Sequence, residues 1–262
     1  MVEGIQDNNH FFSAGRKKDG KIMKTMKTCI VIPAYNEEKT IASVVSKARK
    51  YGPVIVVDDC SKDRTAELAR KSGAKVLKNS RNLGTGGATL AGLNAAIDSK
   101  AGVIITIDAD GQHNPEEIPK FLAKISEGYD FVPGKRNLRQ YPFIKKFGNF
   151  ILNLTTNLVS GTRLKDTESG FRAFKRKALK KLYLRAQRYE ISVEIAFEVG
   201  RNNLRYTNVE IESPLYRKGV GFRDGINNFR YLMQRRKRNW KSYVQDFKFV
   251  MKNMLHSLFG KN

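Results

Sequence analysis

Two carboxylates separated by one residue follow an apolar run in this chain, and their types and spacing suit them to chemistry. Asp108 and Asp110 come directly after the segment Val103–Ile107. In extended backbone, residues i and i+2 lie on the same side, so both charges crowd one small region. Like charges that close destabilise each other unless a cation lies between them. Hard divalent cations prefer oxygen ligands, so the pair predicts a Mg²⁺ or Mn²⁺ site that bridges to substrate phosphates.

The elements that must position this pair alternate along the first half of the chain. Short apolar runs predict strands at residues 29–32, 54–57, 75–77 and 103–107. Helical spacing, caps and a first-turn proline predict helices at 37–51, 64–72, 86–98 and from 114 onward. This alternation predicts an α/β fold, with a parallel sheet covered by helices on both faces.

Polar clusters fall where three of these strands end. Pro33–Glu37 follow the first strand, Asp58–Ser61 the second and Asp108–Gln112 the fourth. The carboxyl ends of parallel strands meet at one edge of a sheet, and ligands of such sheets bind there. We therefore expect the three clusters to form one site at that edge.

The second half is less regular. Residues 143–158 carry apolar side chains at helical spacing, which favours a helix packed on the core; the alternative is an interfacial helix that touches lipid. A basic run at 235–238 precedes an amphipathic segment at 243–259. We expect residues 1–27 to be a flexible leader, 28–228 the catalytic domain and 229–262 a basic tail at a membrane.

The composition is strongly basic and indicates an anionic partner. The 262 residues carry a net charge of +24, which suits nucleotide phosphates, nucleic acid or an anionic membrane surface. Cys29 and Cys60 are too few for a disulfide framework, and we expect buried free thiols. No apolar stretch has the length of a membrane span or the pattern of a secretory signal, so we expect a protein of the cytoplasm, peripheral on the membrane.

Four motifs carry a resemblance to a known family. They are, in chain order, Pro33–Glu37, Val57–Asp63, Arg81–Gly84 and Asp108–His113. Their order and spacing resemble family 2 glycosyltransferases of the GT-A fold, and Asp166–Phe174 further resembles the dolichol-phosphate mannose synthase, or polyprenyl-phosphate glycosyltransferase, branch. The resemblance covers residues 28–224. It implies a Rossmann-like, mostly parallel sheet and the transfer of a sugar from a nucleoside diphosphate donor.

The resemblance also implies roles for single residues. Asp108 and Asp110 hold the metal on the donor diphosphate, and Asp59 faces the nucleotide base. The expected nucleotide-sugar pocket comprises Pro33, Ala34, Tyr35, Glu37, Asp59, Asp108, Ala109, Gln112 and Arg223. The expected catalytic residues are Asp110, Arg136 and Arg217, the two arginines handling phosphate charge. For Asp59 and Glu37 the alternatives are a turn or helix-cap residue and a charge that the helix dipole favours.

The sequence departs from the family in two places. Gly84-Thr85-Gly86 stands where many relatives carry Gly-Lys-Gly, and Gly221–Asp224 replaces a Gly-x-Ser-Lys element. Arg223 could take the place of that lysine as a phosphate contact. The C-terminal transmembrane pair of some relatives has no counterpart in the sequence.

The acceptor determines what else the site needs. A sugar hydroxyl requires a general base, whereas a polyprenyl phosphate is already ionised. The sequence lacks the Glu-Asp and Gln-x-x-Arg-Trp patterns of many processive relatives, but it is rich in cations near the motifs: Lys135, Arg136, Arg139, Lys145, Lys146, Arg163 and Arg172. The many cations and the missing processive patterns favour an inverting, metal-dependent transfer to a dolichyl or polyprenyl phosphate on the cytoplasmic membrane face. The expected donor is GDP-mannose or a UDP-sugar.

Two other hypotheses remain at this stage. One is a soluble glycosyltransferase acting on a glycan or small-molecule hydroxyl, with Asp166 or Glu168 as base. The other is a non-enzymatic protein that binds membrane or nucleic acid on an inactive scaffold. The intact Asp108 and Asp110 argue against an inactive scaffold, and no motif supports nucleic-acid binding.

Overall fold

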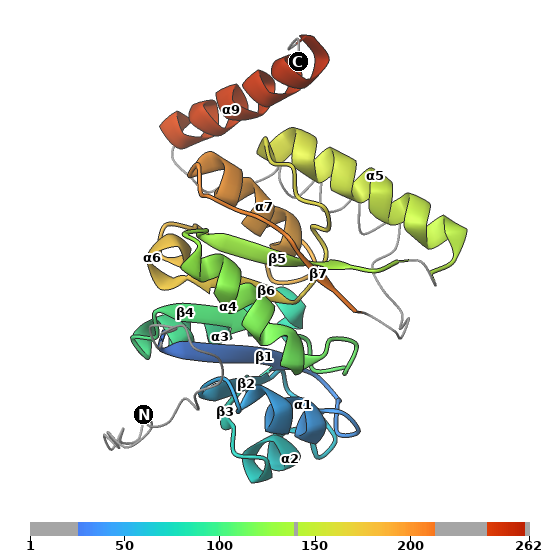
Figure 1. Cartoon of the computed structure of the whole chain (residues 1–262), viewed down its shortest axis with the longest axis vertical. Helices are drawn as coiled ribbons and strands as arrows, with labels where there is room; N and C mark the ends of the chain where they lie inside the picture. Colours follow the sequence, from blue (N-terminus) through green and yellow to red (C-terminus); the bar gives the residue numbers. More distant parts are fainter. Residues whose placement is uncertain (1–25, 139–140, 213–239, 260–262) are drawn as a thin grey trace.

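A mixed sheet is the frame of the molecule (Figure 1). The computed structural model describes residues 26–138, 141–212 and 240–259. In this part of the chain the sheet has the strand order β3-β2-β1-β4-β6-β5-β7. The strands are β1 (Thr28–Ala34), β2 (Val54–Asp58), β3 (Lys75–Lys78), β4 (Val103–Thr106), β5 (Phe131–Arg136), β6 (Arg172–Lys175) and β7 (Val209–Ile211).

The strands are parallel with one exception. Strands β1 to β4 pair in parallel, as do β5 and β7, whereas β6 runs antiparallel to both of its neighbours, β4 and β5. The mostly parallel sheet expected from the sequence is confirmed, and the reversed strand comes from the motif at 166–174. Because β6 is reversed, its first residues lie beside the carboxyl end of β4.

Helices cover both faces of the sheet. Their bounds are α1 (Ile41–Ala48), α2 (Thr65–Lys71), α3 (Gly84–Asp98), α4 (Ile118–Ser126), α5 (Phe143–Ser160), α6 (Arg176–Leu179), α7 (Ile191–Arg201) and α9 (Trp240–Phe259), and a 3₁₀ turn, Pro115–Glu117, precedes α4. Alternate residues of β1 face opposite sides: Ile30 and Ile32 pack with α1 and α4, whereas Cys29 and Val31 pack with α3 and α7. The apolar runs of the strands follow from this double burial.

The first helix is shorter than the sequence pattern indicated. It was expected at 37–51 but spans Ile41–Ala48. Asp63 and Thr65, at the start of α2, accept two backbone N–H groups from the segment before it. The N–H of Glu37 donates to Thr65 Oγ1 at 2.8 Å, and the N–H of Glu38 donates to Asp63 Oδ2 at 3.1 Å. These bonds tie the end of β1 to the loop after β2, two segments that both border the predicted site.

Helix α5 contradicts the expectation that its apolar face packs on the core. Phe143, Phe147, Phe150 and Leu154 are 80%, 57%, 60% and 53% exposed. The C-terminal end of α5 packs on α7, while its first turns project away from the sheet (Figure 1). A sequence pattern reports an apolar face but not what covers it. In the part of the chain that the structure describes, no helix is long and apolar enough to cross a bilayer.

Candidate active site

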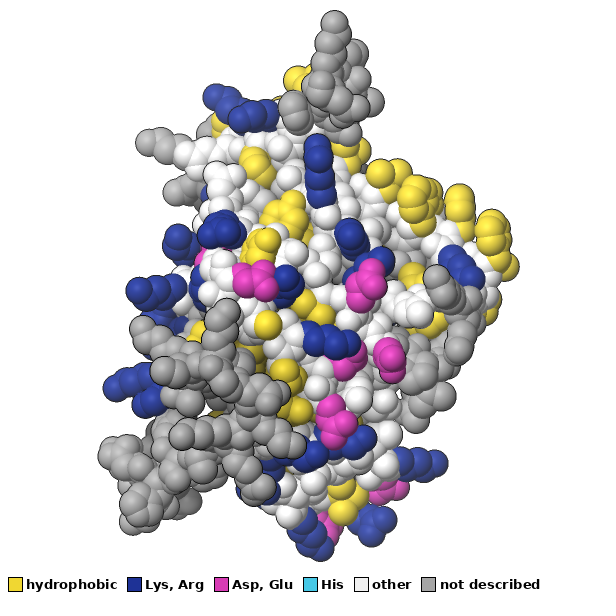
Figure 2. Space-filling view, viewed as in Figure 1, with side chains coloured by type: hydrophobic (Ala, Val, Ile, Leu, Met, Phe, Trp, Pro, Cys, Tyr) yellow, Lys and Arg dark blue, Asp and Glu magenta, His cyan; other side chains and the backbone are white. Residues whose placement is uncertain are grey.

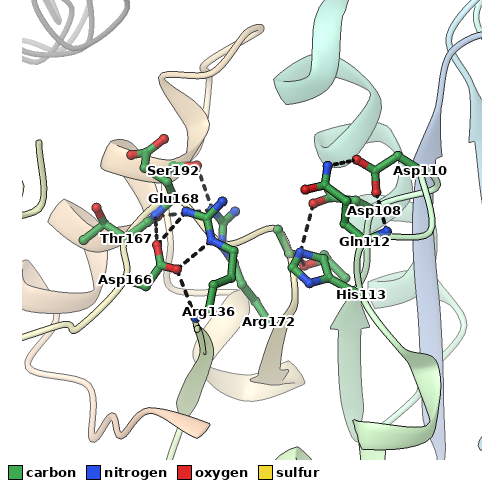
Figure 3. A network of polar contacts seen from close by, with 12 residues as sticks. Asp108, Asp110, Gln112, His113, Arg136, Asp166, Thr167, Glu168, Arg172 and Ser192 are labelled. Carbon is green, nitrogen blue, oxygen red and sulfur yellow. Dashed lines mark hydrogen bonds and ion pairs between the residues drawn. The ribbon is translucent and has the colours of Figure 1, made fainter. Parts of the chain in front are cut away.

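The carboxyl edge of the sheet joins segments from both halves of the chain (Figure 3). Thr106, the last residue of β4, pairs with Arg172, the first residue of β6. The hydroxyl of Thr106 donates to the carbonyl oxygen of Gly170 at 2.7 Å. The loop after β4, which carries the aspartate pair, therefore lies against the loop before β6, which carries Asp166.

Asp108 fits closely against this second loop. A Cβ atom on Gly170 would lie 2.2 Å from both Asp108 carboxylate oxygens, so only glycine leaves room for the carboxylate. His113 Nε2 lies 3.4 Å from Asp108 Oδ2, and the imidazole is buried. Burial alone would raise the pKa of Asp108, but His113, Arg172 and Arg136 outweigh it and lower that pKa below its ordinary value. Asp108 is thus held as a carboxylate.

Asp110 is oriented by its own loop. The backbone N–H of Gln112 donates to Asp110 Oδ1 at 3.0 Å, and the Gln112 side-chain amide donates to Oδ2. Gly111 between them has φ 76°, a conformation that glycine adopts without strain. Ala109 is buried and anchors the loop. The sequence motif places Gln112 beside the aspartate pair, and the geometry agrees.

The donor set at this edge fits a hard divalent cation. Asp108 and Asp110 present partly exposed carboxylates. Among the described residues, no group of three or more His, Cys, Asp or Glu side chains is arranged to hold a metal ion. Mg²⁺ commonly binds through one or two carboxylates and takes its other ligands from water and substrate phosphates. Two carboxylates without further protein ligands are consistent with that mode.

Arg136 and Asp166 form a bidentate ion pair on the other side of the site. Arg136 donates from Nε to Asp166 Oδ2 at 2.7 Å and from Nη2 to Oδ1 at 2.9 Å, and its backbone N–H donates to Oδ2 at 3.2 Å. Asp166 is buried. Burial would raise the pKa of Asp166, but Arg136 outweighs it and lowers that pKa. Burial likewise opposes the charge of Arg136, yet Asp166 raises its pKa above the usual value.

Arg172 lies between the aspartate pair and the Arg136–Asp166 ion pair (Figure 3). Arg172 is 4% exposed, and its Nη2 donates to Ser192 Oγ at 2.7 Å and to the Thr167 carbonyl at 3.4 Å. Burial lowers the pKa of Arg172, against the opposing influence of Glu168, Asp108 and Asp166. It therefore links the aspartate pair to the Asp166 loop electrostatically.

Buried polar atoms without hydrogen-bond partners among the described residues gather at this edge. They include Asp58 Oδ2, His113 Nδ1, Thr167 Oγ1 and Ser169 Oγ. Such atoms are rare in folded proteins, and each one calls for an explanation. They lie at the end of β2, after the end of β4 or before the start of β6, all at the same edge of the sheet, and this favours a site for polar ligands there.

The ends of β1 and β2 form the remaining wall. Pro33 and Ala34 end β1, Tyr35 is 44% exposed beyond them, and Asn36 has φ 55°. The N–H of Asn36 donates to Ser61 Oγ at 2.9 Å, which fastens this turn to the loop after β2. This bond fixes the backbone next to the exposed Tyr35.

Asp59 has a structural role that the sequence left open as an alternative. Its oxygens accept from Asn79 Nδ2 at 2.7 Å, from the Leu83 N–H at 2.9 Å and from the Gly84 N–H at 2.8 Å. Asp59 therefore stabilises the start of α3. Its contact with the base of the nucleotide stays a prediction. Its neighbour Asp58, to which the sequence motif gave no role, is fully buried and keeps one oxygen unpartnered among the described residues.

Some expected residues cannot be placed. Arg217 and Arg223 lie in 213–239 and Arg139 lies in 139–140, outside the described residues. The expected start of the fold at Thr28 is the first residue of β1, whereas the expected boundary at 228–229 lies outside the described residues. The structure brings together Asp108, Asp110, Gln112 and Arg136 from the expected site.

Gly170→Ala is expected to weaken metal-dependent nucleotide binding at least tenfold, since the added Cβ must displace the Asp108 carboxylate. The backbone at Gly170 is compatible with alanine, because its φ is not positive. Titration of UDP and GDP with and without Mg²⁺ measures the effect. Gly148→Ala is the matched control, because a Cβ there meets nothing within 4 Å. Equal affinities for both variants would contradict the proposed position of Asp108.

Known proteins are similar to this chain over most of its length. The family model described as glycosyl transferase family 2 matches residues 29–183. A UDP-N-acetylglucosamine–dolichyl-phosphate N-acetylglucosaminyltransferase of Methanococcus voltae is 36% identical over 70% of this chain and 84% of its own. A polyprenol monophosphomannose synthase of Mycolicibacterium smegmatis is 27% identical over 79% of this chain and 84% of its own.

Solved structures share the fold. Glucosyl-3-phosphoglycerate synthase from Mycobacterium tuberculosis, solved in complex with Mg²⁺ and UDP, matches with a TM-score of 0.64 at 21% identity. The match covers 82% of this chain and 84% of that one. The same enzyme has been solved with Mn²⁺ and UDP-glucose. The GT-A fold expected from the motifs is confirmed.

Proposed function

Because the chain belongs to glycosyl transferase family 2, we propose that it transfers a sugar, with inversion, from a nucleoside diphosphate sugar to a polyprenyl phosphate. The transfer takes place at the cytoplasmic face of a membrane and depends on Mg²⁺ or Mn²⁺. The relatives named for dolichyl-phosphate and polyprenol-phosphate products support the acceptor class. The Methanococcus voltae relative makes UDP-N-acetylglucosamine the first donor to test, ahead of GDP-mannose.

The polyprenyl-phosphate acceptor is supported mainly by the ion pair between Asp166 and Arg136, which makes Asp166 a poor general base. A general base must accept a proton from the acceptor, and its pKa should lie near the working pH. Asp166 is paired with Arg136 through both oxygens, and that pairing lowers its pKa. Glu168, the other candidate, lies in the field of Arg136 and Arg172. A site with cations and no poised base at Asp166 suits an acceptor that is already ionised.

Different residues of the site would bind the donor and the acceptor. Asp108 and Asp110 would bind the cation that neutralises charge on the departing diphosphate. Tyr35, with the ends of β1 and β2, would line the nucleotide pocket. Arg136, oriented by Asp166, has further N–H donors for the acceptor phosphate. Arg217 and Arg223 remain predicted phosphate contacts.

We place the proposed reaction at the membrane surface because the polyprenyl chain of the acceptor is confined to the bilayer. The net charge of +24 favours anionic headgroups. Each cation held near such a surface contributes about 1 kcal/mol to binding. The basic run at 235–238 is part of that charge.

The test is a turnover assay with purified protein in detergent, with Mg²⁺ or Mn²⁺, UDP-N-acetylglucosamine, GDP-mannose or UDP-glucose, and dolichyl phosphate. We expect one donor to yield a glycosyl phosphate lipid, and chelation by EDTA to stop it. Dolichol without its phosphate is the matched control acceptor and should be inert. Turnover of a hydroxyl acceptor but not of the lipid phosphate would overturn the proposal in favour of a soluble transferase.

A further inference from the structure

Helix α5 carries a continuous apolar face that the other described residues leave exposed. Phe143, Phe147, Phe150 and Leu154 follow the spacing i, i+4, i+7, i+11, which places them within about 60° of each other around the helix. All four are more than half exposed, and the Phe143 and Phe147 rings stack with centroids 6.5 Å apart. Figure 2 shows apolar side chains gathered on that side of the molecule. Contiguous exposed apolar surface of this kind marks an interaction site.

The charge around this face indicates what it meets. The sequence of α5 contains two lysines and no acidic residue, within a chain of net charge +24. A helix with an apolar face and basic residues is typical of segments that lie in the plane of an anionic bilayer. A second copy of the chain would bring the same positive charge and be repelled. Charge complementarity therefore favours an anionic lipid surface.

The same helix is connected to the active site. Asn153 Nδ2 donates to the Leu164 and Lys165 carbonyls at 3.1 and 3.0 Å, and Asn153 Oδ1 accepts from the Thr167 N–H at 3.2 Å. These bonds hold the loop that carries Asp166, the partner of Arg136. Along the chain, α5 begins seven residues after Arg136.

The C-terminal end of α5 is firmly mounted on the fold. Gly200 of α7 approaches it so closely that a Cβ would lie 1.8 Å from the Ser160 carbonyl oxygen. Asn253 of α9 donates to the Val159 carbonyl at 3.4 Å. A rigidly mounted helix transmits its position on a surface to the loop that it holds.

We infer that the Phe143–Leu154 face of α5 inserts into anionic lipid and thereby places Arg136 at the depth of the acceptor phosphate. The inference rests on the proposed function for the identity of the acceptor. It assigns membrane docking to α5 in addition to the basic tail. Insertion of apolar side chains resists salt, whereas binding through cations alone is screened.

The first experiment measures insertion directly. Phe147→Trp in a Trp240→Phe background gives the chain a single reporter, because Trp240 is the only tryptophan. With vesicles of phosphatidylcholine and phosphatidylglycerol, we expect a blue-shifted emission that brominated acyl chains quench. Tyr189→Trp in the same background is the control, since Tyr189 is 50% exposed and lies outside α5. Quenching at Tyr189→Trp but not at Phe147→Trp, or at neither, would overturn the inference.

The second experiment removes the apolar face. Phe147→Ser/Phe150→Ser should lower vesicle binding by about 100-fold, as expected when two large apolar side chains lose their burial. Tyr189→Ser removes an aromatic side chain that is 50% exposed and lies outside both α5 and residues 229–262, and it should change binding far less. A Phe147→Ser/Phe150→Ser variant that turns a dimer into a monomer without losing vesicle binding would identify a contact between copies instead.

Turnover separates this inference from the proposed function. Phe147→Ser/Phe150→Ser should use lipid phosphate in detergent at the wild-type rate but lose at least tenfold in rate on lipid phosphate embedded in vesicles. Equal rates in vesicles would overturn the docking role while leaving the proposed function intact. A wild-type protein that inserts α5 but uses no polyprenyl phosphate even in detergent would contradict the proposed function alone.

Discussion

Replacing Asp110 by asparagine is expected to lower kcat by about 10³-fold, because a neutral amide cannot hold the cation that stabilises charge on the departing diphosphate. The change preserves side-chain volume, and Asp110 lies in a partly exposed loop, so the fold should survive. Its hydrogen bonds to Gln112 can be replaced in part by the new amide. The loss should therefore appear in chemistry and metal-dependent binding rather than in stability.

The measurement pairs turnover with nucleotide titration. Wild-type protein should bind UDP or GDP more tightly when Mg²⁺ or Mn²⁺ is added, and Asp110→Asn should show no such gain. Asp98→Asn is the control, because Asp98 is an exposed carboxylate at the far end of α3. A variant at Asp110 that retained both the metal-dependent gain and the rate would exclude the assigned metal role.

Asp166→Asn is expected to reduce the free energy of unfolding by about 3 kcal/mol, the usual cost of removing one partner from a buried ion pair. Asp166 is 1% exposed and binds Arg136 through both carboxylate oxygens. The variant should also lose activity, because Arg136 is no longer oriented toward the acceptor. Urea unfolding and turnover in detergent measure the two effects.

A double variant identifies the pair as the cause. Asp166→Asn/Arg136→Met removes both charges, so it should be less destabilised than Asp166→Asn, which leaves Arg136 buried without its partner. Strictly additive losses would mean that the two side chains act independently and that the observed pair contributes little.

The stability difference between wild type and Asp166→Asn should depend on pH in one direction. The pKa of Asp166 is lowered in the folded state, so its contribution is complete above the unfolded value of about 4. It is lost as the pH falls through the folded pKa. Unfolding curves should therefore differ by a constant amount from pH 7 to about 5 and converge in stronger acid. A difference that grew in acid would contradict the lowered pKa.

The first half of the fold could be predicted because its signals are local. Strands β1, β2 and β4 are apolar runs buried on both faces, and the polar residues that follow them mark the carboxyl edge. The predicted strand at 103–107 is β4, Val103–Thr106, and the aspartate pair follows it as expected. A hydrophobic pattern is enough to identify such elements, because the burial of each strand on both faces is written in its own residues.

The reversed strand β6 and the exposed face of α5 could not be predicted in the same way. The partners of β6 are chosen by tertiary packing, and its sequence, Arg172–Lys175, carries no mark of direction. An amphipathic pattern in α5 is the same whether lipid or protein covers it. Likewise, the sequence does not reveal that Asp59 stabilises the start of α3, because the Leu83 and Gly84 N–H groups are backbone donors common to every residue except proline.

The reversal of β6 also sets an order for assembly. During synthesis, β1 to β4 are complete long before Arg172 emerges, yet Thr106 of β4 pairs with Arg172. Until then β4 is an open sheet edge, and open edges pair readily with other chains. Closing that edge joins residues 66 positions apart, a slow non-local step. Because the same step brings Gly170 against Asp108, a nascent chain acquires the observed geometry of the aspartate loop only when the open edge of β4 is closed.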